Sequence, residues 1–343
     1  MSLRHLIKWA GLSVVLFGAT PLLAAEKPSF ADYVGGLKKE AIEKGYSAQW
    51  VDQVFSQVSY RKRIVKADKN QAEFKLTLER YLNTRVPEWK VKQAREKFKK
   101  HEKLLQEIGK KFGVQPRFIV ALWGLETNFG RIQGKHKVVD SLVTLAYDGR
   151  REALFKRELW AALKILDQDH ISQDKFIGSW AGAMGQTQFM PSSFLAYAVD
   201  YDGDGKKDIW GNQKDAFASI ANYLKSEGWN DAMTWGRQVK LPTDLNDTLV
   251  MTKERSNKKL WNQRWNETKR SLKDWNDLGL RRMDGNQLPT VDIKATLIVP
   301  DDRKGRAYLA YDNFKTLMHW NRSYYFVASV GLLSDRIKYP AMK

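Results

Sequence analysis

Apolar residues recur at intervals of three and four positions through most of this 343-residue chain. The pattern runs from Phe30 to about Lys111 and returns over residues 116–130, 142–166, 215–228 and 311–337. Residues with this spacing lie on one side of an α-helix, where they can pack on a common core. The pattern therefore predicts a mainly helical protein.

Residues 232–311 differ from the rest because short β-type runs replace the helical spacing. These runs occur at 237–241, 248–251, 296–300 and 306–311. The last two flank a turn at 301–305, which predicts a hairpin, and one short helix is expected near 271–278. The predicted fold class is thus mainly α (α+β). Its predicted segments are a signal peptide at 1–25, a helical region at 26–231, a small β-rich insertion at 232–311 and a helical return to the core at 312–343.

The first 25 residues have the layout of a cleaved secretory signal. Arg4 and Lys8 precede an apolar stretch from Trp9 to Leu23, and small residues follow at Ala24 and Ala25. The stretch is short for a membrane span and contains a proline. The chain has no cysteine, so it can carry neither disulfides nor a lipid-anchored cysteine. We therefore expect a periplasmic protein without a transmembrane anchor in its mature form.

The chain is strongly basic, with 58 Lys and Arg against 39 Asp and Glu and a formal net charge of +19. Such a balance suits a polyanionic partner. Nucleic acid is the common partner of basic proteins, but an exported protein meets anionic cell-wall polymer and lipid headgroups first. The alternative is a solvated helix face, because six lysines between Lys97 and Lys111 alternate with glutamates.

Glu126 is the main candidate for catalysis because it lies in an otherwise apolar helical segment. Pro116 suits the first position of this helix and Gly130 a position just past its end. Glu126 follows Ile119 by seven residues and Leu122 by four, so it continues the core-facing stripe. Burial and the negative end of the helix dipole both favour the protonated acid, which general-acid catalysis requires. The alternative is a structural glutamate paired with Arg131.

A second polar motif occupies residues 178–191. Gly182 and Gly185 allow close approach of the backbone, and Gln186 and Gln188 offer amide donors and acceptors. Aromatic and methionine side chains stand between them. This mixture suits a sugar, whose hydroxyl and acetamide groups form hydrogen bonds while the ring face packs on an aromatic. A glycine-containing turn packed on the core is the alternative.

The two motifs resemble those of the lytic murein transglycosylase B family. The matching runs are Ala121-Leu-Trp-Gly-Leu-Glu-Thr-Asn-Phe-Gly130 and Ser179-Trp-Ala-Gly-Ala-Met-Gly-Gln-Thr-Gln-Phe-Met-Pro-Ser-Ser193. The resemblance implies a lysozyme-like (goose-type) helical catalytic domain that cleaves the β-1,4 bond between N-acetylmuramic acid and N-acetylglucosamine. It also implies a product with a 1,6-anhydro end, one glutamate that acts first as acid and then as base, and no cofactor for catalysis.

The same resemblance implies substrate-binding roles for several other residues. Ser179 and Gln188 match residues that hold the saccharide, and Tyr223 and Tyr81 resemble tyrosines of the substrate cleft. Asn321 matches a C-terminal cleft asparagine, while its neighbour Trp320 stands where the family usually has tyrosine. Arg150 and Arg151 fall where the family often has a basic pair facing the peptide stem or the lactyl group. An arginine pair on the surface is the alternative for these two residues.

A calcium-loop-like segment spans residues 200–215. Asp200, Asp202 and Asp204 occupy positions one, three and five of such a loop, and Lys206 would offer its backbone carbonyl at position seven. Position twelve is a glycine, so the resemblance offers Asp215 as the closing ligand. We expect a structural Ca²⁺ here, without a catalytic role. The alternative is an Asp/Gly turn that binds no metal.

The leading functional prediction is a peptidoglycan lytic transglycosylase, acting as a monomer on glycan strands. A non-catalytic peptidoglycan-binding protein and a hydrolytic muramidase remain the alternatives. Cell-wall synthesis or division proteins are further candidate partners, whereas nucleic acid is not expected.

Overall fold

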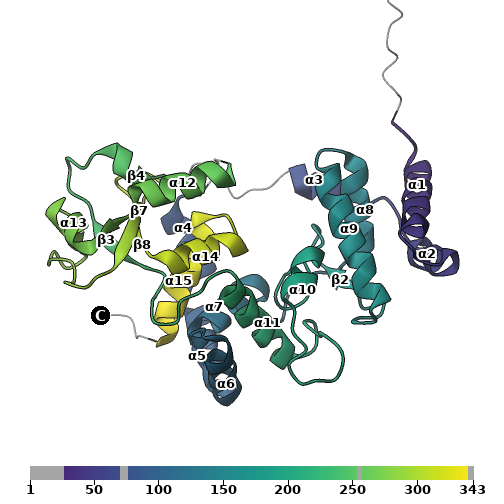
Figure 1. Ribbon diagram of the computed structural model, residues 1–343, viewed down its shortest axis with the longest axis horizontal. Coiled ribbons are helices and arrows are strands. Elements are labelled where there is room, and N and C mark those ends of the chain that lie inside the picture. The colour runs from purple at the N-terminus through teal and green to yellow at the C-terminus, as the bar shows by residue number, and fades with distance from the viewer. Residues whose placement is uncertain (1–26, 70–75, 253–256, 339–343) are drawn as a thin grey trace, which may run out of the picture.

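The computed structural model describes residues 27–69, 76–252 and 257–338, so the predicted signal peptide at 1–25 lies outside the described residues. Helices dominate the described chain as far as residue 226 (Figure 1). They are α1 (Phe30–Glu43), α2 (Ala48–Phe55), α3 (Lys62–Lys69), α4 (Leu78–Arg85), α5 (Glu88–Lys100), α6 (Glu102–Phe112), α7 (Pro116–Thr127), α8 (Val138–Asp148), α9 (Glu152–Asp167), α10 (Pro191–Tyr197) and α11 (Gln213–Ser226).

A six-stranded sheet follows, with a strand order of β4-β7-β8-β3-β6 and β5 beside β7. Its members are β3 (Gly236–Lys240), β4 (Val250–Met251), β5 (Arg270–Ser271), β6 (Arg281–Arg282), β7 (Lys294–Ile298) and β8 (Ala307–Ala310). Strands β7 and β8 form the hairpin predicted around 301–305, whereas β4 pairs with β7 in parallel. The two-stranded pair β1 (His136–Lys137) and β2 (Ile177–Gly178) lies apart from this sheet.

Four further helices accompany the sheet or follow it, namely α12 (Lys258–Thr268), α13 (Leu272–Asp277), α14 (Asp312–Trp320) and α15 (Tyr324–Lys338). Helix α12 was not predicted from the sequence. Its core side includes only Trp261, Trp265 and Thr268, and charged or amide residues fill most of the other positions, so the apolar pattern is weak. The sequence also predicted single helices at 142–166 and 311–337, but each consists of two helices. In the first of these segments, Gly149, with φ of 90°, ends α8 before α9 begins.

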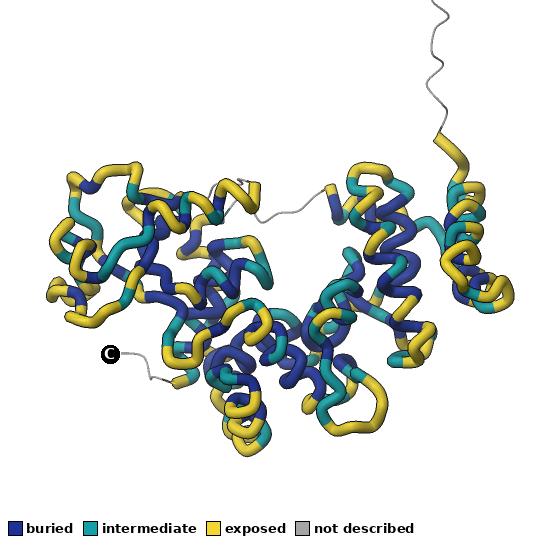
Figure 2. The backbone as a smooth tube through the Cα atoms, viewed as in Figure 1, coloured by how far each residue is buried: buried dark blue, intermediate teal, exposed yellow. Residues whose placement is uncertain are grey.

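The molecule has two lobes joined through α7, α11, α5 and α6 (Figure 1). One lobe contains α3 and α8–α10, and the other contains the sheet with α4, α12 and α14. Figure 2 shows buried backbone running through both lobes and the helices between them. The large core spans both lobes, while a smaller cluster between Val239 and Tyr311 is confined to the insertion. Helix α7 is the most deeply placed connection, since ten of its 12 residues are buried.

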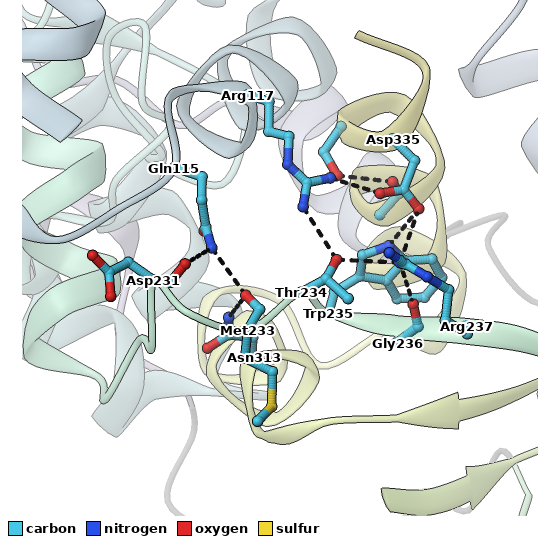
Figure 3. Close-up of polar contacts among 12 residues, drawn as sticks. Gln115, Arg117, Asp231, Met233, Thr234, Trp235, Gly236, Arg237, Asn313 and Asp335 are labelled. Atoms are coloured by element: carbon cyan, nitrogen blue, oxygen red, sulfur yellow. Dashed lines mark hydrogen bonds and ion pairs between the residues drawn. The ribbon is translucent and has the colours of Figure 1, made fainter. Parts of the chain in front are cut away.

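The start of α7 holds the segment that leads into the sheet (Figure 3). Arg117 donates from Nη1 to Asp335 of α15 at 2.6 Å and from Nη2 to Thr234 at 3.2 Å. Asp335 also accepts from the Trp235 indole at 3.0 Å. Gln115 donates to the Met233 carbonyl at 3.0 Å. Because Arg117 is buried and Asp335 is half-buried, these charge-assisted contacts fix the insertion relative to α7.

One buried lysine of α5 opposes folding at neutral pH. Lys90 is only 7% exposed, and burial, with the nearby charge of Arg85, lowers the pKa of its ammonium group to about 8. The unfolded chain holds its proton up to about pH 10.4. The unfolded state therefore binds more protons between these values, and stability rises with pH in that window, while below about pH 8 the full cost of burial persists.

We expect Lys90→Met to raise the free energy of unfolding at pH 7 by about 1–3 kcal/mol, because it removes the buried charge while retaining the aliphatic stem. Urea unfolding at pH 7 and pH 9.5 measures the effect, which should be smaller at the higher pH. The exposed neighbour Lys92→Met is the control and should change stability little. A loss of stability in Lys90→Met at pH 7 would contradict this explanation.

Candidate active site

Glu126 lies half-buried on the last turn of α7 and is joined there by a tryptophan from a distant part of the chain. The indole Nε1–H of Trp320, at the end of α14, donates to Glu126 Oε1 at 2.8 Å, across 194 residues of sequence. Arg131, the alternative partner considered from sequence, is exposed and forms no ion pair with any described residue. The structural-glutamate alternative in that form is therefore not observed.

Helix α7 ends at Thr127, earlier than the position of Gly130 suggested. The two residues that follow the helix adopt left-handed backbone conformations, although neither is a glycine. Asn128 has φ of 50° and Phe129 has φ of 61°. Such backbone conformations are costly outside glycine and occur preferentially at functional sites. The Phe129 ring packs on Gly124, where a Cβ would lie 2.6 Å from it. Arg85 of α4 donates to the Leu125 carbonyl at 2.8 Å, which satisfies one acceptor of this helix end.

Trp320 belongs to an aromatic cluster that also contains Phe189, Tyr197 and Tyr223. Its ring centroid lies 4.7 Å from that of Tyr223 and 5.3 Å from that of Phe189. Tyr197 lies 4.5 Å from Tyr223 on the far side. Burial, as the main cause, raises the pKa of the Tyr223 phenol above its usual value. The cluster therefore presents neutral, rigid faces beside the carboxyl group of Glu126.

Glu227 is a second carboxylate close to this cluster, and the sequence analysis missed it. The Tyr197 hydroxyl donates to Glu227 Oε1, and His319 Nδ1 lies 2.7 Å from Glu227 Oε2. These side chains line a cavity of about 230 Å³ together with Tyr223 and Asn262. Glu227 directly follows α11, four residues after Tyr223, and this spacing was the signal that could have revealed it.

Gln186 joins the second motif to α7. Its Oε1 accepts from the Trp123 indole at 2.8 Å, and its Nε2 donates to the Trp210 carbonyl at 3.1 Å. Thr127, next to Glu126, donates to the Gln186 carbonyl at 3.2 Å. Gly130 is needed at its place, since a Cβ there would lie 2.5 Å from Gln186 Oε1. The buried amide of Gln186 thus fixes the two motifs against each other.

Ser179 and Gln188, predicted to hold a saccharide, both take part in the turn of the second motif. Ser179 Oγ accepts from the Ala183 amide at 3.0 Å. Gln188 has a left-handed backbone with φ of 52°, and its Nε2 donates to the carbonyls of Gln133 and Gly185 at 3.1 and 3.0 Å. The turn is therefore held by its own polar groups, and both side chains remain partly accessible.

The predicted basic pair, Arg150 and Arg151, is held by one buried carboxylate. Both guanidinium groups pair with Asp68, whose side chain is 2% exposed, while their own side chains are 50% and 38% exposed. Two positive charges thus surround one negative charge at the end of α3. Sequence reasoning missed Asp68 because it lies about 80 residues before the pair.

Tyr81 and Asn321, the other predicted binding residues, occupy different surroundings. Tyr81 of α4 is buried, with its ring centroid 5.5 Å from that of Tyr325. The Tyr325 hydroxyl donates to Asp301 in the β7–β8 turn. Asn321 directly follows Trp320 and ends α14, where its backbone amide donates to the Leu317 carbonyl at 3.1 Å.

The structure gathers only part of the predicted calcium set. Carboxylate oxygens of Asp200, Asp202 and Asp204 lie within 4.8 Å of one another. Asp215 is not in this group, and its oxygens accept from the amides of Tyr201 and Asp208, each at 2.8 Å. Burial, as the main cause, raises the pKa of Asp215 to about 6. The Lys206 amide donates to Asp204 Oδ1 at 2.8 Å, which closes the turn.

Comparison with known proteins supplies a family for this arrangement. A family model described as Transglycosylase SLT domain matches residues 29–335. The membrane-bound lytic murein transglycosylase B of Escherichia coli (strain K12) is 42% identical over 130 residues. That alignment covers 38% of this chain and 36% of the relative, so the match spans little more than a third of the relative's length.

Solved structures match over most of the chain. SltB3 from Pseudomonas aeruginosa, in complex with NAG-anhNAM-pentapeptide, has a TM-score of 0.82 and 36% identity, covering 90% of this chain and 80% of that one. The Escherichia coli lytic transglycosylase Slt35, in complex with calcium, has a TM-score of 0.74 and 27% identity, covering 89% and 92%. The predicted helix-rich, lysozyme-like fold with a small sheet is thereby confirmed.

We expect Gln186→Leu to lower the free energy of unfolding by about 2–4 kcal/mol, because it leaves the Trp123 indole N–H and the Trp210 carbonyl buried without their partner. Urea unfolding followed by far-UV circular dichroism measures the loss. Gln53→Leu, at an exposed position of α2, is the matched control. Equal stability of the two variants would show that the Gln186 amide does not hold the motifs together.

Proposed function

Because this chain belongs to the transglycosylase SLT domain family, we propose that it is a lytic transglycosylase that cleaves the β-1,4 bond between N-acetylmuramic acid and N-acetylglucosamine in peptidoglycan. The observation that carries the proposal is the hydrogen bond from Trp320 to Glu126 at the end of α7. It fixes the orientation of the carboxyl group beside the aromatic cluster, as a proton donor aimed at one bond requires.

The reaction needs a single carboxyl group in two successive roles. Protonated Glu126 donates its proton to the glycosidic oxygen, and the bond from that oxygen to the muramic acid C1 breaks. The 6-hydroxyl oxygen of the same muramic acid then bonds to C1, and its proton passes to the Glu126 carboxylate. The products are a free 4-hydroxyl on N-acetylglucosamine, a 1,6-anhydro end and the regenerated acid. Because the nucleophile is tethered to the reacting carbon, proximity supplies much of the acceleration.

Most hydrolytic glycosidases use a second carboxylate across the scissile bond. The carboxylate near the aromatic cluster is Glu227, and both of its oxygens already have partners in Tyr197 and His319. This arrangement favours a positioning role for Glu227 over activation of a water molecule. It supports the intramolecular route over the hydrolytic alternative.

We propose that Tyr81, Ser179, Gln188, Tyr223, Trp320 and Asn321 contact the glycan strand, with Arg150 and Arg151 near its peptide stems. The aromatic cluster supplies faces on which sugar rings can pack. The basic pair supplies charge for carboxylates. These roles would make peptidoglycan strands the main partner, and they would suit an enzyme of the periplasm.

Localisation in the periplasm rests on the signal-like residues 1–25 and on the nature of the substrate. Among the described residues, no helix combines the length and apolar character needed to cross a bilayer. Action as a monomer and contacts with wall-synthesis or division proteins remain predictions.

The acidic turn fits a structural Ca²⁺. Asp200, Asp202 and Asp204 converge, and like charges at such short range are costly unless a cation neutralises them. These three carboxylates and the Lys206 carbonyl would hold the ion. Asp215 would stabilise the loop through its two amide contacts instead of closing the coordination shell. The ion would stiffen the segment before α11, which carries Tyr223.

Glu126→Gln should reduce the release of muropeptides from purified sacculi by about 10²–10⁴-fold, because the amide cannot donate a proton as an acid. Mass spectrometry of the wild-type products should find muramic acid ends lighter by one water than reducing ends. Glu96→Gln, an exposed change on α5, is the control and should retain full activity. Reducing ends in the wild type would establish the hydrolytic alternative. Undiminished release by Glu126→Gln would remove Glu126 from its catalytic role.

Calcium at saturating concentration should raise Tm relative to the protein in chelator, by about 2–4 °C for each kcal/mol of binding energy linked to folding. Differential scanning calorimetry measures the shift. The double variant Asp200→Asn/Asp204→Asn should lose this response, while Asp244→Asn at an exposed site should keep it. A wild-type Tm that does not respond to calcium would favour the metal-free turn.

A further inference from the structure

A basic pocket of about 570 Å³ lies at the start of α3, and the mechanism above does not use it. Its charged lining comes from Arg61, Lys62 and Arg63 on one side and from Lys135, His136 and Lys137 on the other. Asp140 of α8 is the carboxylate that lines it. Five permanent positive charges therefore face one negative charge within a single hollow.

Arg61 is fixed in place before any ligand arrives. Its Nε and Nη2 donate to the same oxygen of Asp140 at 2.9 and 2.7 Å. The Asp140 side chain is 4% exposed, whereas that of Arg61 is 49% exposed. The backbone amide of Arg61 also donates to Thr144 at 3.2 Å. A guanidinium has five N–H donors, so this anchoring leaves a rigid, accessible group with donor capacity.

Three cations of the pocket have no counter-charge. Among residues 27–69, 76–252 and 257–338, no carboxylate lies within ion-pairing distance of Lys62, Arg63 or Lys135. Lys62 and Arg63 lie in the first turn of α3. The N-terminal end of a helix favours negative charge, but this turn carries no acidic residue. Burial and then the charges of Lys135 and Arg61 lower the pKa of His136. The local potential is therefore strongly positive, and an anion would relieve it.

The pocket adjoins the second motif. His136 pairs with Gly178 in the β1–β2 ladder, and Ser179 follows directly. The preceding residues are also attached, because Gln188 donates to the Gln133 carbonyl at 3.1 Å. At the other end of α3, Asp68 holds Arg150 and Arg151. Helix α3, which has eight residues, thus has cationic groups at both ends, and the pocket at its start adjoins the second motif.

We propose that the basic pocket binds the carboxylates of a peptide stem on the peptidoglycan strand, a stem other than the one near Arg150 and Arg151. The inference rests on the proposed function, because that function brings stem-bearing glycan to Ser179. Several carboxylates on one flexible peptide match a hollow with several cations, and Arg and Lys form charge-assisted hydrogen bonds with such groups. The enzyme would then favour strands whose stems are intact.

Calorimetric binding tests this in the Glu126→Gln background, where turnover does not interfere. The ligands are a glycan of two disaccharide units with pentapeptide stems and the same glycan without stems. The variant Lys62→Gln/Arg63→Gln/Lys135→Gln should bind the stem-bearing glycan about tenfold more weakly and the stem-free glycan unchanged. Lys99→Gln/Lys103→Gln/Lys110→Gln, which removes the same charge from α5 and α6, should leave both affinities unchanged.

The His136 imidazole gives a second readout that needs no pocket mutation. Its NMR signals should shift on addition of the stem-bearing glycan but not of the stem-free glycan. Equal loss of affinity for both glycans, or no loss for either, would overturn the proposal. Inorganic phosphate that shifts His136 while the stem-bearing glycan does not would assign the pocket to phosphate and overturn it too. Failure of the proposed function would be distinct, since it would show as absent muropeptide release by the unmodified enzyme.

Discussion

A carboxyl group held at the end of a buried helix is the constraint on which the rest of the molecule depends. Helix α7 has ten buried residues, and Glu126 is the position on its last turns that remains partly accessible. The helix is held at its start by the Arg117–Asp335 pair and near its end by the Gln186 amide. A carboxyl group that moves little suits the proton-donor role proposed for Glu126, because small displacements are costly to catalysis.

The chain returns to Glu126 only after the whole β-rich insertion. The insertion departs beside Arg117 and comes back as α14, which delivers Trp320 to Glu126. The sheet therefore acts as a rigid spacer whose base is bonded to the same helix that carries the acid. Its own small core, centred on residues such as Trp275 and Leu297, keeps that spacer folded. The indole N–H of Trp320 provides the bond to the carboxyl group.

In the lobe that contains α3, the same kind of ion pair occurs at two places. Two buried carboxylates, Asp68 and Asp140, each hold arginine side chains that remain partly exposed. Such pairing overcomes the cost of burying an isolated carboxylate and fixes the direction of the guanidinium groups. The net charge of +19 is thus partly organised into specific sites, and not only spread over a solvated face.

The sequence by itself determined the helical class, the hairpin at 301–305 and the motif around Glu126, because local spacing and turn residues encode these features. It could not reveal Asp68 or the basic pocket, since their partners lie tens of residues away or more. It also missed α12, whose apolar pattern is weak. Which side chains meet depends on how the helices pack, and packing is a property of the whole core and not of any segment. Only the tertiary structure therefore decided that an indole, and not Arg131, would hold the acid.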